Sequence, residues 1–120
     1  MPQIPKVIDD IINEFITGVN EILGPHVKKI MLYGSYARGD YNDNSDIDIM
    51  ILSDLTDKEI VKYRDEIWDL AYDIESKNHF TIEISPLLKN IDRFNYWLEG
   101  LPFYMNIQKE GVVLNESKNI

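Results

Sequence analysis

The sequence predicts a domain of the α/β or α+β class, in which a small mixed β-sheet is flanked by helices. The prediction rests on the order of the apolar patterns: a long helical stripe comes first, segments with strand patterns follow, and a second helical segment separates two of those strands. The chain has 120 residues, which is enough for one core. We therefore assign residues 1–120 to a single domain, with its motif core at residues 30–85.

The first half of the chain alternates between helical and strand patterns. Apolar residues recur at helical spacing from about Ile4 to Leu23, and Gly24-Pro25 is expected to end this helix. Lys28 to Gly34 contains a continuous apolar run, which is typical of a buried strand. Residues 34–45 are polar and predict a loop, or a short helix and a loop. Asp46 to Leu52 alternates and predicts the second strand.

The second half begins with a helix signal. Thr56-Asp57-Lys58-Glu59 has the form of a capping box, and the helix that it opens is expected to end at Lys77-Asn78. Phe80 to Ser85 alternates and predicts a third strand. Pro86 suits the first turn of a further helix, which Gly100 and Pro102 would break. Residues 103–108 are ambiguous, and residues 112–114 predict a short last strand.

Aromatic residues outside these strands are expected to close the core. Trp68 falls on the apolar stripe of the helix that follows the capping box. A second group, near Gly100, fits either core closure or a partner surface, and core closure is the favoured interpretation. Its members are Phe94, Tyr96, Trp97, Phe103 and Tyr104.

The composition restricts the classes of partner. The formal net charge is −9, so direct binding to nucleic acid is not expected, because the phosphate backbone is bound mainly by Lys and Arg. A basic protein partner, or a small substrate with its own metal ions, suits this charge better. The sequence has no cysteine, which excludes disulfides and thiolate metal sites. No apolar run reaches the roughly 20 residues of a membrane span, and no secretory signal is recognised, so we expect a cytoplasmic protein without membrane association.

Acidic residues on two predicted strands form a candidate metal site. Asp46 and Asp48 are two residues apart, so their carboxylates share one face of a strand. Two close carboxylates repel each other, and a hard divalent cation such as Mg²⁺ offsets this repulsion. Glu83 lies on the third predicted strand and can face the same way. Three converging carboxylates can hold two metal ions.

A glycine and a serine at the end of the first strand form a candidate phosphate site. Gly34 permits a sharp turn and a close approach, and Ser35 adds a hydroxyl donor. Arg38 lies one turn further on. The spacing matches neither the dinucleotide fingerprint G-x-G-x-x-G nor the Walker loop.

Together these residues resemble the signature of a known superfamily. Tyr33-Gly34-Ser35-Tyr36-Ala37-Arg38-Gly39, followed by Ser45-Asp46-Ile47-Asp48-Ile49, is similar to the motif of the polymerase-β-like nucleotidyltransferases. In that motif a Gly-Ser pair precedes an Asp-x-Asp pair. The short chain resembles the minimal nucleotidyltransferases, called MNT proteins, which are the antitoxin components of HEPN/MNT toxin–antitoxin pairs.

The resemblance implies a role for each matching residue. Gly34 and Ser35 would contact the nucleotide triphosphate, with Arg38 as a further phosphate contact. Asp46 and Asp48 would bind two Mg²⁺ ions, for which Mn²⁺ is an alternative. Glu83 would complete the catalytic and metal site and accept a proton, although the family usually has aspartate there.

The resemblance also implies the reaction and the partner. A hydroxyl oxygen would attack the α-phosphorus of a nucleoside triphosphate, with ATP the expected donor. The acceptor would be a side chain of a HEPN-domain toxin, commonly tyrosine, and the added AMP would silence the toxin. Two alternatives remain open: a non-catalytic module that neutralises its partner by binding, and a small-molecule nucleotidyltransferase of the aminoglycoside type. The oligomeric state is left open.

Overall fold

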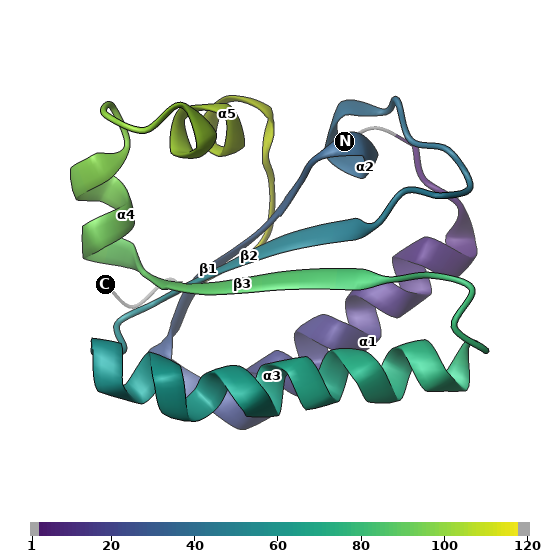
Figure 1. Ribbon diagram of the computed structural model, residues 1–120, viewed down its shortest axis with the longest axis horizontal. Coiled ribbons are helices and arrows are strands. Elements are labelled where there is room, and N and C mark those ends of the chain that lie inside the picture. The colour runs from purple at the N-terminus through teal and green to yellow at the C-terminus, as the bar shows by residue number, and fades with distance from the viewer. Residues whose placement is uncertain (1–2, 118–120) are drawn as a thin grey trace.

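The computed structural model describes residues 3–117, which form a four-stranded mixed sheet with helices on both faces (Figure 1). This confirms the predicted fold class. In chain order the elements are α1 (Lys6–Leu23), the short 3₁₀ helix η1 (Gly24–His26), β1 (Val27–Tyr33), α2 (Ser35–Arg38), β2 (Ile47–Ser53), α3 (Asp57–Lys77), β3 (Ile84–Asn90), α4 (Ile91–Trp97), α5 (Pro102–Glu110) and β4 (Val112–Glu116).

The sheet has the strand order β3-β2-β1-β4. Strand β1 is antiparallel to both β2 and β4, whereas β2 and β3 are parallel and are connected through α3. A parallel pair needs such a crossover, because the chain must return to the edge where the first strand began. The end of β1 and the starts of β2 and β3 therefore lie at the same end of the sheet.

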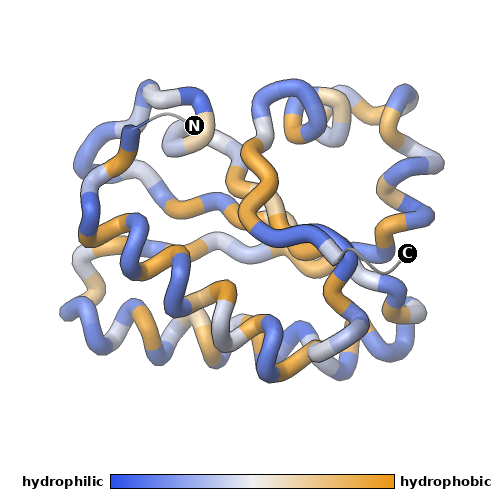
Figure 2. The backbone as a smooth tube through the Cα atoms, turned by 180° about the vertical axis from the view of Figure 1, so that it is seen from behind, coloured by the Kyte–Doolittle hydropathy of each residue, from blue (hydrophilic) through white to orange (hydrophobic). Residues whose placement is uncertain are grey.

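Each face of the sheet has its own core. Helices α1 and α3 pack against one face, where Phe15 and Ile49 are fully buried. Helices α4 and α5 lie over the other face, where Met50, Phe94 and Ile107 form the centre of a smaller core. Figure 2 shows that hydrophobic residues are concentrated on the strands and recur at intervals along the helices. No helix within residues 3–117 is long and apolar enough to span a bilayer.

Both long helices follow the predicted patterns closely. The apolar stripe of α1 is buried or partly buried as expected, apart from Val7, which is exposed. The capping box at the start of α3 is confirmed. The Thr56 hydroxyl accepts from the Glu59 backbone N–H at 3.3 Å, and the Glu59 carboxylate accepts from the Thr56 N–H at 3.0 Å. These reciprocal bonds satisfy two donors at the start of the helix.

The strand predicted at residues 80–85 and the helix predicted to begin at Pro86 both have the wrong boundaries. His79 and Phe80 have φ angles of 57° and 56°, so they form a left-handed turn rather than the start of a strand. Strand β3 begins at Ile84 and passes through Pro86, and α4 begins only at Ile91. Pro86 is tolerated inside β3 because this strand is at the edge of the sheet.

The outer edge of β3 has no free hydrogen-bond donor at Ile84 and Pro86, in the first half of the strand. The Glu83 carbonyl accepts from the Ile47 N–H in β2 at 2.8 Å. Because backbone groups alternate in direction along a strand, those of Ile84 and Pro86 point away from β2. The Ile84 N–H donates to the Glu75 carboxylate of α3 at 2.7 Å, and Pro86 has no N–H.

The aromatic residues are less buried than predicted. Trp68 is 46% exposed, because it lies beside the buried stripe of Ile67, Ala71 and Ile74 rather than on it. Phe94 is buried as expected, whereas Tyr96 is 78% exposed. The ambiguous residues 103–108 belong to α5.

Candidate active site

The end of β1 and the starts of β2 and β3 bring the predicted site residues together at one end of the sheet. Tyr33, the last residue of β1, pairs with Asp48 in β2, and Gly34 follows directly. The carbonyl of Glu83, just before β3, accepts from the N–H of Ile47. The glycine turn, the Asp pair and the third acid, which are far apart in the sequence, therefore become neighbours.

The turn after β1 requires glycine at position 34. Gly34 has φ 76° and ψ −156°, a conformation that only glycine adopts readily. A Cβ built on Gly34 would lie 2.2 Å from the Asp48 Oδ2 atom. Glycine thus allows both the turn and the close approach of the Asp48 carboxylate to the backbone.

The two aspartates lie on the face of β2 that points away from α1 and α3. Ile47 and Ile49, their alternating neighbours, are fully buried on the opposite face. Asp48 lies within β2, whereas Asp46 directly precedes the strand. Both side chains are half-buried. The predicted sharing of one face follows from this alternation.

The environment of Asp48 opposes its ionised form. Burial raises the pKa of Asp48 from 3.8 to about 6, and the negative charges of Asp46 and Glu110 act in the same direction. The Arg38 guanidinium lowers the pKa of Asp48, but it does not compensate for these effects. This carboxylate therefore lies where a further positive charge would be favourable.

Glu83 lies beside Asp46 at the mouth of the site. The charge of Asp46, followed by a hydrogen bond between the two carboxyl groups, raises the pKa of Glu83 above its ordinary value. A depression of about 190 Å³ is lined by residues 43–46 and 80–83, and thus by both side chains. The structure therefore brings Glu83 beside Asp46, on the exposed side of the site.

The two aspartates are compatible with a metal site in which a bound ligand supplies further oxygens. Within residues 3–117, no three Asp, Glu or His side chains are arranged as a preformed metal cluster. Asp46 and Asp48 nevertheless supply oxygen ligands on one face, and burial, followed by the negative charges of Asp46 and Glu110, raises the pKa of Asp48. Mg²⁺ is usually held by one or two carboxylates together with substrate phosphates and water. The Asp pair fits that mode, and the role of Glu83 as a metal ligand stays a prediction.

Ser35 and Arg38 lie on the short helix α2 that follows Gly34. Ser35 is half-exposed, and its hydroxyl has no hydrogen-bond partner among the described residues. The Arg38 Nε donates to Asp40 Oδ2 at 3.1 Å, and its Nη1 donates to Glu110 Oε1 at 3.2 Å. The positions of both side chains are consistent with the predicted phosphate contacts, which stay predictions.

Glu110 is a site residue that sequence reasoning missed. Its Oε1 atom accepts from the Gly34 backbone N–H at 3.3 Å and from the Arg38 guanidinium at 3.2 Å. The signal lies in the pairing of β4 with β1, where Val112 is opposite Leu32. Since the strands are antiparallel, the residues before Val112 lie beside those after Leu32. Without that pairing, nothing in the sequence connects Glu110 with the glycine turn.

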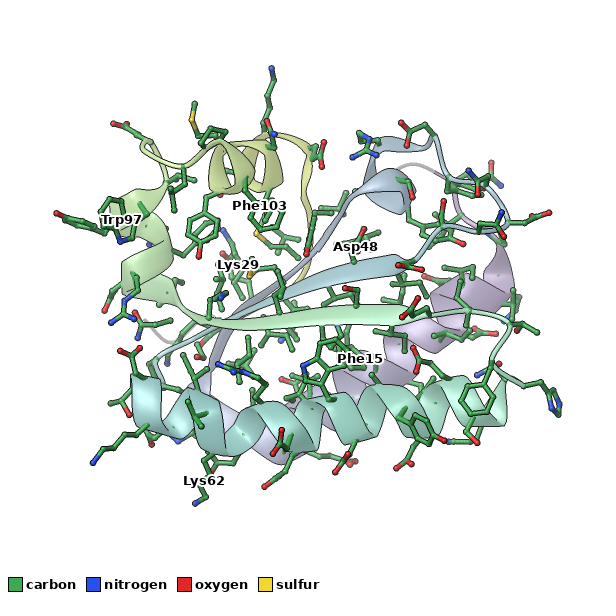
Figure 3. All side chains as sticks on the ribbon, viewed as in Figure 1. Phe15, Lys29, Asp48, Lys62, Trp97 and Phe103 are labelled. Atoms are coloured by element: carbon green, nitrogen blue, oxygen red, sulfur yellow. The ribbon has the colours of Figure 1, made fainter. Side chains whose placement is uncertain are left out.

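An aromatic pair adjoins Asp48 through Tyr33, which is its cross-strand partner. Phe103 of α5 contacts Tyr33 edge-to-face, with ring centroids 5.8 Å apart, and Figure 3 labels both Phe103 and Asp48 on the face of the sheet opposite to Phe15. Phe103 is 49% exposed. Burial, with a smaller effect from the Asp48 charge, raises the pKa of Tyr33 to about 12, so its hydroxyl stays protonated at neutral pH.

We expect Asp48→Asn to stabilise the metal-free protein at neutral pH. A carboxyl whose pKa is raised on folding stabilises the fold below about pH 4, and this contribution is lost as the pH rises through about 6. The full shift corresponds to about 3 kcal/mol, which solvent around the half-exposed side chain reduces to about 1–2 kcal/mol. Urea unfolding in EDTA should show Asp48→Asn gaining this much over wild type between pH 4 and pH 7. An equal gain in Asp69→Asn, on the exposed surface of α3, would contradict the assignment.

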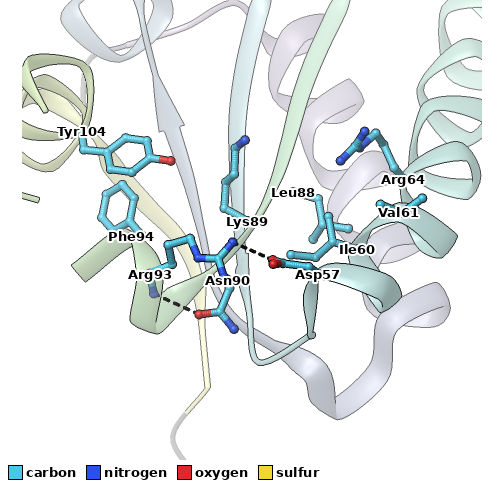
Figure 4. A pocket seen from close by; sticks show the side chains of 10 residues that line it. All are labelled: Asp57, Ile60, Val61, Arg64, Leu88, Lys89, Asn90, Arg93, Phe94 and Tyr104. Carbon is cyan, nitrogen blue, oxygen red and sulfur yellow. Dashed lines mark hydrogen bonds and ion pairs between the residues drawn. The ribbon is translucent and has the colours of Figure 1, made fainter. Parts of the chain in front are cut away.

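A second cleft, of about 240 Å³, lies at the other end of β3 (Figure 4). Arg64, Lys89 and Arg93 contribute positive charge to its lining, and Arg93 Nη1 donates to Asp57 Oδ1 at 2.7 Å. The carboxylate site lies beside the start of β3, whereas this cleft adjoins its last residues. The two sites are therefore separate.

Curated relatives with similar sequences come from one archaeon. The Methanocaldococcus jannaschii protein named "Putative protein adenylyltransferase MJ0604" is 34% identical over 103 residues, which cover 86% of this chain and 93% of that protein. A second protein from that organism, with the same name but numbered MJ0141, is 36% identical over 81 residues, which cover 68% of this chain and 78% of that protein.

Solved structures share the fold at lower identity. A toxin–antitoxin crystal structure with AMP-PNP has a TM-score of 0.51 at 21% identity, covering 87% of this chain and 73% of that one. A crystal structure described as that of "a putative nucleotidyltransferase from Sulfolobus solfataricus" has a TM-score of 0.50 at 19% identity. The match covers 99% of this chain and 95% of that one.

A family model described as "Nucleotidyltransferase domain" matches residues 12–114 of the chain. The matched range contains every residue of the site, from the glycine turn through the Asp pair to Glu110. With this match and the sequence identity to the archaeal relatives, the chain belongs to the nucleotidyltransferase domain family.

Proposed function

We propose that this nucleotidyltransferase transfers AMP from ATP to a hydroxyl group of a partner protein, in a reaction that depends on Mg²⁺ or Mn²⁺. The observation that carries the proposal is the placement of the Asp48 carboxylate directly against the Gly34 turn. This placement puts candidate metal ligands beside a candidate phosphate site. The names of the archaeal relatives support a protein acceptor.

The partner that we propose is a HEPN-type toxin, which the AMP group would silence. One of the structural neighbours is a toxin–antitoxin structure with AMP-PNP, and another is of the toxin–antitoxin MntA-HpeT. The net charge of −9 also favours a basic protein surface over nucleic acid. The cell compartment that we propose is the cytoplasm, where ATP and such a partner would both be present.

The proposed reaction is an in-line displacement at the α-phosphorus of ATP. The acceptor oxygen forms a bond to phosphorus, the bond to the bridging oxygen of the β-phosphate breaks, and pyrophosphate leaves. Glu83 takes the proton of the acceptor hydroxyl. Its raised pKa suits it to this role as a general base. Tyr33 is excluded as the base, because its hydroxyl stays protonated.

The other site residues hold the nucleotide in place. Asp46 and Asp48 would hold the divalent ions, which neutralise phosphate charge and lower the pKa of the acceptor hydroxyl. Arg38 and the Gly34 N–H would donate to phosphate oxygens, and the Ser35 hydroxyl would add a donor. The protein thus contributes positioning and charge rather than a covalent intermediate.

The test is transfer of label from a nucleotide to the partner. The purified chain is mixed with Mg²⁺, a candidate HEPN-type partner protein, and each of the four nucleoside triphosphates labelled at the α-phosphate. Label is expected on the partner with ATP, and no label is expected with γ-labelled ATP. Label from the γ-phosphate would indicate phosphoryl transfer and contradict the proposal.

The second candidate function is a non-catalytic module that neutralises its partner by binding. The glutamate at position 83, where the nucleotidyltransferases that the motif resembles usually have aspartate, favours it. A stable complex that forms without any transfer of label, with either Mg²⁺ or Mn²⁺, would establish this alternative.

A further inference from the structure

The carboxylate of Glu110 occupies the donors that the proposed function assigns to phosphate. One oxygen, Oε1, accepts from both the Gly34 N–H and the Arg38 guanidinium. We propose that Glu110 is a built-in competitor of the nucleotide: its carboxylate takes the place of a phosphate oxygen and must leave when a triphosphate binds. The inference rests on the proposed function, since that function places the triphosphate at Gly34 and Arg38.

The chemistry of the two ligands explains why they exclude each other. Carboxylate and phosphate oxygens both accept from guanidinium groups and backbone N–H groups, with similar geometry. The Gly34 N–H is a single donor, so it cannot serve both ligands at full strength. Two anions beside one guanidinium also repel each other, and Asp48 adds a further negative charge nearby.

The electrostatic setting makes the position of Glu110 unusual for an acid. Its charge acts on Asp48 in the same direction as that of Asp46, so Glu110 adds to an existing surplus of negative charge. Its side chain is only 25% exposed, so solvent screens it incompletely. The contacts with Gly34 and Arg38 are what hold it there. A ligand that takes over these contacts would release it.

The backbone around Glu110 is held firmly, so the side chain is the part that can move. Ile107, one turn earlier on α5, is buried. A Cβ on Gly111 would lie 2.4 Å from the Ile107 carbonyl oxygen and 2.7 Å from the Met31 Cε atom, so the end of α5 is closely packed against β1. Release therefore requires rotation of the Glu110 side chain toward solvent rather than movement of the helix.

The experiment measures binding of inorganic triphosphate by calorimetry, in EDTA and at constant ionic strength. Inorganic triphosphate has no nucleobase, and EDTA removes divalent metal ions. Its binding therefore reports the anion site alone. Glu110→Gln preserves the side-chain size but removes the charge, and we expect its Kd to be about tenfold lower than that of wild type, or about 1.4 kcal/mol. Glu99→Gln is the matched control, because Glu99 is exposed on the connection between α4 and α5; its Kd should equal that of wild type.

A double variant shows where the anion binds. Adding Arg38→Gln to Glu110→Gln should abolish the gain, because the guanidinium is the shared partner. The proposal would be overturned by a Kd for Glu110→Gln equal to or higher than that of Glu99→Gln, with thermal unfolding showing both to be folded. It would also be overturned if the gain persisted in the double variant.

The outcomes separate this inference from the proposed function. A lower Kd for Glu110→Gln without transfer of labelled AMP by any variant would support the competition and contradict the transferase. Transfer of labelled AMP by wild type, with no decrease in the triphosphate Kd of Glu110→Gln, would support the transferase and contradict the competition.

Discussion

Asp48→Asn is expected to lower the rate of AMP transfer by about 10³-fold, because loss of one metal ligand removes several kcal/mol of charge stabilisation. Asparagine has nearly the same size, and the buried neighbours Ile47 and Ile49 are unchanged. The fold should therefore be retained. The measurement is the initial rate of label transfer to the partner at saturating ATP and Mg²⁺.

Asp69→Asn is the matched control for this variant. It makes the same chemical change on the exposed surface of α3 and alters the net charge equally. Its transfer rate should match that of wild type. A rate for Asp48→Asn within threefold of the control would show that this carboxylate does not hold the metal, and the proposed mechanism would then fail.

Gly34→Ala is expected to abolish transfer and also to destabilise the fold. The φ and ψ angles of Gly34 are strained for alanine, at a cost of about 1–3 kcal/mol. The new methyl group would also meet the Asp48 Oδ2 atom at 2.2 Å, so either the turn or the carboxylate must move. Urea unfolding and transfer rates, measured where the variant is still folded, separate the two effects.

Gly24→Ala is the matched control for the backbone strain. Gly24 also has a positive φ, 54°, but a Cβ built there has no atom within 4 Å. It lies just before β1, at the other end of that strand from Gly34. This variant should lose stability but keep the transfer rate. Equal transfer rates for the two alanine variants would contradict the role of the turn in the site.

The parts of the fold that could be predicted are those with a single dominant pattern. Helix α1 has one apolar stripe, and α3 has both a stripe and a capping box, so their limits were predicted to within about two residues. Strand β1 is largely apolar and β2 begins with alternating residues, and both lie close to the predicted ranges. In these segments local propensity and burial favour the same structure.

The region after α3 could not be predicted, because its local signals are misleading. Proline is common at the first position of helices, but Pro86 lies inside an edge strand. Leu87 and Leu88 follow each other, as in a helix stripe, but they pack into the cores on opposite faces of the sheet. Only the tertiary arrangement, in which both faces of β3 are covered, explains this pattern.

The candidate site was partly predictable for a similar reason. Gly34, Asp46 and Asp48 lie within one short motif, so their proximity follows from two adjacent strands. The position of Glu83 next to Asp46 depends on the parallel pairing of β3 with β2. The alternating pattern predicted the face of the sheet on which its side chain lies, although Glu83 itself lies just before the strand. Glu110 depends on the pairing of the last strand with the first, which the sequence does not reveal.

The capped edge of β3 limits how this protein can associate with other chains. A strand added beside β3 would find no backbone donor at Pro86, and at Ile84 it would have to displace the Glu75 carboxylate. Extension of the sheet from molecule to molecule through this part of the edge is therefore disfavoured. This disfavours fibril-like self-assembly through these residues, and β-augmentation by a partner strand is disfavoured at the same place.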